Sequence, residues 1–96
     1  MYANMDAVRR ANRDAGHYFF EPETMRFFAS RVGETLYAGR YFVSSERGHG
    51  RQRRYTVREA LPDGSIEPVG RFQEHATRAA AIAAIRRLRP LWSRVP

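Results

Sequence analysis

The sequence has no cysteine and no lysine in its 96 residues. Without cysteine it can form no disulfide, no thiolate zinc site and no thiol nucleophile. Its three histidines are far apart in the chain, so we expect no metal and no other cofactor. It also lacks a long apolar run and the hydrophobic core of a signal peptide, which predicts a soluble, cytoplasmic protein without a membrane span.

The apolar content is nevertheless sufficient for a packed core. Hydrophobic residues make up 43% of the chain and aromatic residues 12%, which separates it from a disordered arginine-rich tail. The length predicts one domain over residues 1–96, with no room for two cores. Residues 1–16 are expected to form a loosely ordered N-terminal helix.

Arginine supplies all 17 basic residues, against 10 acidic ones, and the net charge is +7. Codon bias in a GC-rich genome can explain the choice of arginine over lysine, but not the clustering of five arginines between residues 47 and 58, where no acid occurs. The guanidinium group offers a planar fork of donors that matches phosphate oxygens. Charge and clustering therefore favour a nucleic acid, a ribonucleoprotein or an acidic protein as partner.

The N-terminal third of the chain is expected to be mainly helical. The pattern predicts a short helix over residues 2–14 and a short edge strand over 17–20. Pro22 suits the first turn of a helix, and the acids beside it favour the positive end of the helix dipole. A helix of about three turns is expected to begin there and to end before Gly33.

From residue 36 the apolar spacing changes to two, which indicates strands. Three strands are expected, over residues 36–45, 53–60 and 66–73. A last helix is expected over 77–88, with Thr77 as its N-cap and Pro90 as its end. The prediction is an α+β fold in which helices pack on one face of a three-stranded antiparallel meander. The pattern does not decide whether a fourth short strand is present.

Successive strand residues point to opposite faces of a sheet. One face is expected to be apolar and to pack against the helices: Tyr41, Val43, Tyr55, Val57, Ile66 and Phe72. The other is expected to carry Val69 and to gather four arginines around Phe42 and Thr56: Arg40, Arg54, Arg58 and Arg71. The hairpin loop would extend that surface with Arg47, Arg51 and Arg53. Such a surface can contact a nucleic-acid backbone while an exposed Phe42 stacks on a base.

Two other interpretations of the arginine face stay open. A sheet covered on one side exposes polar residues on the other, so the arginines could form an ordinary solvated surface on which Glu59 or Glu67 pairs with some of them. The same charges could instead dock on an acidic protein or a ribonucleoprotein.

Ser44, Ser45, Glu46 and His49 are close in sequence, as the members of a hydrolase site can be. A catalytic triad needs a base that a third group holds in a fixed orientation. A histidine between two glycines in a loop lacks this support. We therefore expect a protein that is not an enzyme.

The stretch from Val69 to Phe72, followed by Thr77 and an alanine-rich segment, resembles the end of the plant ethylene-response type of DNA-binding domain. In that family a third strand leads into an alanine-rich helix and the sheet face contacts DNA. The resemblance implies the same use of the sheet here.

Six stretches carry a broader resemblance: Tyr18–Phe20, Pro22–Phe28, Ser30–Arg31, Tyr41–Glu46, Arg54–Arg58 and Gly70–Phe72. Together they are similar to a family of small uncharacterised proteins from phages and bacterial mobile elements. The resemblance implies no catalytic residues. It implies an accessory protein of the bacterial host cell that binds nucleic acid, or alternatively an inhibitor of a host factor such as a defence nuclease complex, in the manner of anti-CRISPR proteins.

Overall fold

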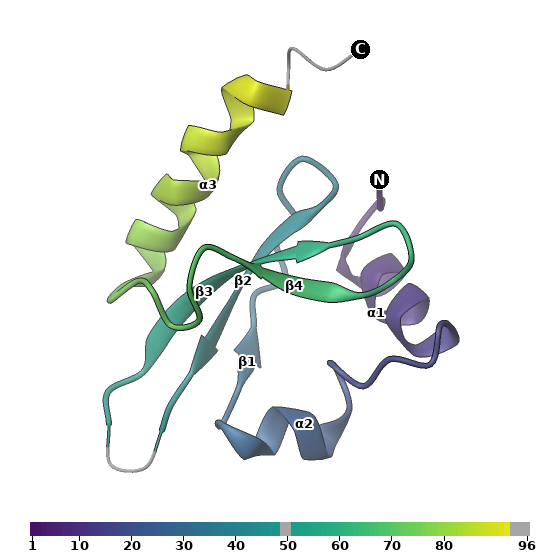
Figure 1. Cartoon of the computed structure of the whole chain (residues 1–96), viewed down its shortest axis with the longest axis horizontal. Coiled ribbons are helices and arrows are strands. Elements are labelled where there is room, and N and C mark those ends of the chain that lie inside the picture. Colours follow the sequence, from purple (N-terminus) through teal and green to yellow (C-terminus); the bar gives the residue numbers. More distant parts are fainter. Residues whose placement is uncertain (49–50, 93–96) are drawn as a thin grey trace.

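The computed structural model describes residues 1–48 and 51–92. Within these ranges the elements are α1 (Met5–Asp14), α2 (Pro22–Phe27), β1 (Arg31–Val32), β2 (Tyr41–Glu46), β3 (Arg54–Ala60), β4 (Ile66–Val69) and α3 (Arg78–Trp92). The strands form one antiparallel sheet in the order β1-β2-β3-β4 (Figure 1). The predicted α+β class and the antiparallel meander are confirmed, and a fourth strand is present.

α2 is shorter than predicted. It ends at Phe27, whereas the helical spacing predicted a helix almost as far as Gly33. The chain turns back at Ala29, whose φ is +47°, and the N–H of Ser30 donates to the carbonyl of Met25 at 2.6 Å. A residue in the left-handed region commonly ends a helix, so the residues that follow are free to join the sheet.

β1 is the fourth strand, and it lies elsewhere than expected. Arg31 and Val32 pair with β2, while residues 17–20 form no strand. Val32 packs against the cluster around the buried Phe42. Burial of a β-branched side chain in the sheet therefore outweighs the helical spacing of this segment.

β2 and β4 are also shorter than predicted because turns adjoin them. β2 begins at Tyr41 rather than at Leu36, after a turn in which the N–H of Tyr41 donates to the carbonyl of Tyr37 at 2.9 Å. β4 ends at Val69 rather than at Gln73, and Gly70 directly after it has a φ of +81°.

α3 begins as predicted and continues further. The Thr77 hydroxyl accepts a hydrogen bond from the N–H of Ala80 at 3.1 Å, which caps the first turn. The helix passes through Pro90, where its end was predicted, and reaches Trp92. A proline removes one helical donor and can be accommodated as a kink. No helix within residues 1–48 and 51–92 has the length and hydropathy needed to cross a membrane.

Helices cover both faces of the sheet, so the prediction that they cover only one was wrong. The core on the first face consists of Tyr41, Val43 and Val57 from the sheet with Ala81 and Ile85 from α3. The core on the second face consists of Phe42 and Ala60 from the sheet with Met5 and Val8 from α1. Figure 1 shows α3 and α1 on opposite sides of the strands.

β4 presents its side chains to the faces opposite to those predicted. Ile66 pairs with Ala60, and Val69 pairs with Val57. Ile66 therefore packs on the side of α1 and Val69 on the side of α3. Alternation groups the residues of one strand, but only the register between strands assigns each group to a face. Phe72, predicted to lie in the core, comes after β4 and is 41% exposed.

Gly64 lies where the turn between β3 and β4 meets α1. The side-chain amide of the buried Asn12 donates to the Gly64 carbonyl at 2.8 Å. The φ of Gly64 is +85°, and an added Cβ would lie 2.5 Å from the carbonyl oxygen of Ala11. Replacing Gly64 by alanine should lower the free energy of unfolding by about 1–3 kcal/mol through backbone strain, and further through this clash.

Gly16→Ala is a matched control. Gly16 also has a positive φ, +82°, but an added Cβ there would meet nothing within 4 Å. In urea unfolding, Gly64→Ala should lose clearly more stability than Gly16→Ala. Equal losses would contradict a close contact between this turn and α1.

Candidate nucleic-acid interface

Phe42 lies in the core and not on an exposed sheet face. Its exposed fraction is 0%, and it packs beneath Met5 and Val8 of α1. The rings of Phe19 and Phe20 each lie 6.1 Å from the Phe42 ring, centroid to centroid. The prediction that Phe42 is exposed for stacking on a base was therefore wrong, because the N-terminal 20 residues cover this part of the sheet.

Two of the arginines that were predicted to share an exposed sheet face are paired with carboxylates. Arg40 Nη2 lies 2.6 Å from Glu59 Oε2, and this hydrogen bond raises the pKa of Arg40 above its ordinary value. Arg58 Nη2 lies 3.3 Å from Glu46 Oε2, and the side chain of Arg58 is only 11% exposed. Both positive charges are compensated inside the protein, so these arginines have little to offer an external phosphate.

Glu46 is the centre of a buried polar network. It is 1% exposed and accepts hydrogen bonds from the hydroxyls of Ser44 at 2.6 Å and Thr56 at 2.7 Å. Arg58 completes this network by donating to both Ser44 and Glu46. Ser44 and Glu46 therefore serve the core, and His49 lies outside the described residues. In the described part of the chain, no three His, Asp or Glu side chains could together hold a metal ion.

Arg54 and Arg71 lie at the turn that follows β4. Arg54 donates to the carbonyls of Gln73 at 2.8 Å and Glu74 at 2.9 Å, which fastens this turn to β3. The backbone N–H of Arg71 donates to the Glu74 carboxylate and lowers the pKa of Glu74 below its ordinary value. The side chain of Arg71 is exposed, but the neighbouring carboxylate weakens this turn as a site for anions.

The three predicted loop arginines come together at the loop end of the β2–β3 hairpin. There they line an open hollow of about 420 Å³, which we call the arginine hollow: Arg31, Arg47, Arg51, Gln52 and Arg53. Among the described residues, no acidic side chain lines it. Arg47 Nε donates to the Arg51 carbonyl at 3.1 Å, and Arg53 Nη1 donates to the Ser45 hydroxyl at 3.0 Å. These bonds orient two of the side chains and leave other guanidinium donors for a ligand.

Arg31 belongs to the arginine hollow although the sequence placed it in a helix. Its pairing with Ser45 in the sheet brings it beside the hairpin. It also lines a second hollow of about 160 Å³ on the side of α3, together with Tyr55 and Arg78. No local signal marks this residue, because its position depends on which strand it pairs with.

A cluster of exposed rings adjoins the arginine hollow. The phenylalanine cluster consists of Phe27, Phe28 and Phe72, which are 78%, 37% and 41% exposed. The ring centroids lie 4.7 Å apart for Phe27 and Phe28, and 5.4 Å apart for Phe28 and Phe72. The N–H of Arg47 donates to the Phe28 carbonyl at 2.6 Å, so the backbone of the cluster lies beside the backbone of the hollow. The sequence missed this cluster because it placed Phe28 in a helix stripe and Phe72 in the core.

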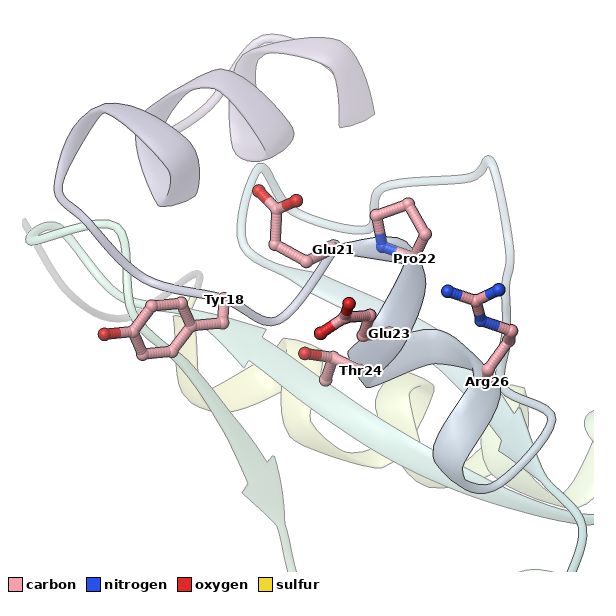
Figure 2. A pocket seen from close by; sticks show the side chains of 6 residues that line it. All are labelled: Tyr18, Glu21, Pro22, Glu23, Thr24 and Arg26. Atoms are coloured by element: carbon pink, nitrogen blue, oxygen red, sulfur yellow. The ribbon is translucent and has the colours of Figure 1, made fainter.

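Another hollow, of about 580 Å³, opens at the start of α2 and has a different character. Its lining is Tyr18, Glu21, Pro22, Glu23, Thr24 and Arg26. Figure 2 shows its two carboxylates, Glu21 and Glu23, near the start of the helix. Their negative charge disfavours a phosphate ligand, so the arginine hollow is the better candidate for an anion site.

These features define a small α+β domain whose four-stranded antiparallel sheet is covered on both faces. Its hairpin end carries arginines that have no acidic partner within the described ranges, close to exposed rings. The chain belongs to a family of unknown function, DUF7447, whose sequence profile matches residues 4–86. The matched range contains the arginine hollow and the phenylalanine cluster. The comparisons with curated proteins and with solved structures found no match.

Proposed function

We propose that this protein binds nucleic acid through the arginine hollow at the end of the β2–β3 hairpin. The observation that supports the proposal is the gathering of four arginines, Arg31, Arg47, Arg51 and Arg53, with no acidic side chain among the described residues that line the hollow. By contrast, Arg40 and Arg58 are paired with carboxylates of the sheet. The hollow therefore gathers four arginines that have no acidic partner among the described residues.

A site of this kind recognises the phosphate backbone. Each guanidinium that neutralises a phosphate releases a condensed counterion, which makes affinity depend on salt. With about four phosphates contacted, the slope of log affinity against log salt should be about −3 for a single strand and about −3.5 for a duplex. The biological setting that we propose is a non-enzymatic accessory protein of a phage or mobile element, acting in the bacterial cytoplasm.

The double variant Arg47→Ala/Arg51→Ala tests the proposal. It should weaken nucleic-acid binding about tenfold to a hundredfold at about 50 mM salt, because two charge-assisted contacts are lost. Fluorescence polarisation with labelled DNA and RNA measures the affinity, and a salt titration should show a shallower slope for the variant.

Arg10→Ala/Arg13→Ala is the matched control, since it removes the same charge from exposed positions on α1. Figure 1 shows α1 far from the hairpin end. The control should retain nearly all of the affinity. If it loses as much as the hairpin variant, binding reflects net charge and not this site. A wild-type protein that binds no DNA or RNA at about 50 mM salt refutes the proposal. In that event, a partner that co-purifies after nuclease digestion would support an inhibitor of a host protein.

A further inference from the structure

We propose that the nucleic acid is single-stranded and that its bases stack on the phenylalanine cluster while its phosphates lie against the arginine hollow. This inference rests on the proposed function and specifies its ligand. A base inside a duplex keeps its faces covered by its neighbours, whereas an unpaired base can present a face to an aromatic ring. Rings beside a basic hollow are thus suited to a single strand.

The two halves of the surface are joined through the backbone. Phe28 accepts a hydrogen bond from the N–H of Arg47 at 2.6 Å, and Arg31 follows three residues later in the chain. We therefore expect a strand whose phosphates contact Arg47 to pass close to the backbone of Phe28. Proteins that bind single strands without sequence preference combine a positive groove with aromatic side chains in this way.

The phenylalanine cluster is supported from beneath by the buried network. The guanidinium of Arg58 lies 5.5 Å from the centroid of the Phe72 ring, and Arg58 is itself held by Glu46. Phe72 in turn contacts Phe28, and Phe28 contacts Phe27. The rings of Phe72 and Phe28 are therefore supported before a ligand arrives, which reduces the entropy lost when a base stacks on them.

Phe27 is the ring whose position the fold explains least. It is 78% exposed at the end of α2, and the ring of Phe28 is its aromatic neighbour. Exposed apolar side chains that gather in one patch commonly mark a binding surface. Since the adjoining hollow is basic, a ligand that combines an anionic backbone with flat apolar faces suits the whole surface.

The test compares three labelled probes of equal length: a thymidine DNA strand and a uridine RNA strand of about 20 nucleotides, and a DNA duplex. Wild-type protein should bind at least one single strand about tenfold more tightly than the duplex. Phe27→Ala should weaken single-strand binding about tenfold and leave duplex binding unchanged. Because Phe27 is so exposed, this variant should keep the wild-type circular dichroism and urea midpoint.

Tyr18→Ala is the matched control, because Tyr18 is 74% exposed but lies beside the carboxylates at the start of α2 (Figure 2). It should not change the affinity for any probe. Phe28→Ala, at a less exposed ring of the same cluster, should weaken single-strand binding as Phe27→Ala does. The DNA and RNA strands show which nucleic acid is preferred, and a preference for either supports the inference.

The inference and the proposed function can fail separately. If no probe binds, the proposed function itself is wrong. If the arginine variant weakens binding but duplex and single strand bind equally and Phe27→Ala has no effect, the inference alone is overturned. If Phe27→Ala abolishes self-association in sedimentation velocity without changing single-strand binding, the cluster is a dimer contact, which also overturns the inference.

Discussion

Replacement of Glu46 by alanine should lower the free energy of unfolding by about 3–5 kcal/mol, because it leaves a largely buried guanidinium without its counter-charge. Arg58 would lose the carboxylate at 3.3 Å, and the hydroxyls of Ser44 and Thr56 would lose their acceptor. Each buried donor without a partner costs free energy beyond the loss of its bond. Urea unfolding followed by circular dichroism measures the effect.

A second, more exposed ion pair of the sheet provides the comparison. Arg40 and Glu59 are joined at 2.6 Å, but their side chains are 38% and 20% exposed. Water can solvate the remaining arginine there, so Glu59→Ala should cost only about 1 kcal/mol or less. Adding Arg58→Ala to the Glu46 variant should recover part of the loss, since the unpaired charge is then removed. Equal costs for Glu46→Ala and Glu59→Ala would contradict the burial of the network.

Phe42→Ala should destabilise the protein by about 3–5 kcal/mol, because it opens a cavity between the sheet and α1. The Phe42 side chain is fully buried and contacts both Met5 and Val8 as well as the rings of Phe19 and Phe20. Urea unfolding measures the loss, and Phe27→Ala, at an exposed ring, should change stability by no more than about 0.5 kcal/mol.

The same two variants separate a core role from a binding role. Folded Phe42→Ala should bind nucleic acid as wild type does, whereas Phe27→Ala should bind single strands more weakly at unchanged stability. If Phe42→Ala instead folds with wild-type stability and binds nucleic acid more weakly, the sheet face around Phe42 is the binding surface.

These predictions follow from the way in which the charges are divided. In the sheet, Arg40 and Arg58 use their charges within the protein, in pairs with Glu59 and Glu46. The hairpin end holds arginines that are not paired with acids in the described part of the chain. The residues that cluster in sequence include Arg47, Arg51 and Arg53, which line one hollow, and also Arg54 and Arg58, which have a structural role.

Local patterns predicted much of the fold. Alternation placed Tyr41 and Val43 with Val57 on one face, and the observed β2–β3 register confirms this grouping. Thr77 caps α3 as expected, since its hydroxyl can reach the first helical turn. These features depend on residues close in sequence or on the period of the strand, both of which can be read without knowledge of the fold.

The α+β class, the faces of β2 and β3 and the basic loop were determined by the sequence alone, through spacing, caps and charge. Only the tertiary structure decided that α1 covers Phe42 and that Ile66 packs on the side of α1. It also decided that Arg31 pairs with β2 in the sheet instead of continuing the predicted helix. Each of these outcomes depends on contacts between distant segments. Local propensity differs by less than about 1 kcal/mol between the alternatives, whereas burial of a large apolar side chain contributes about 1.5–3 kcal/mol and therefore prevails.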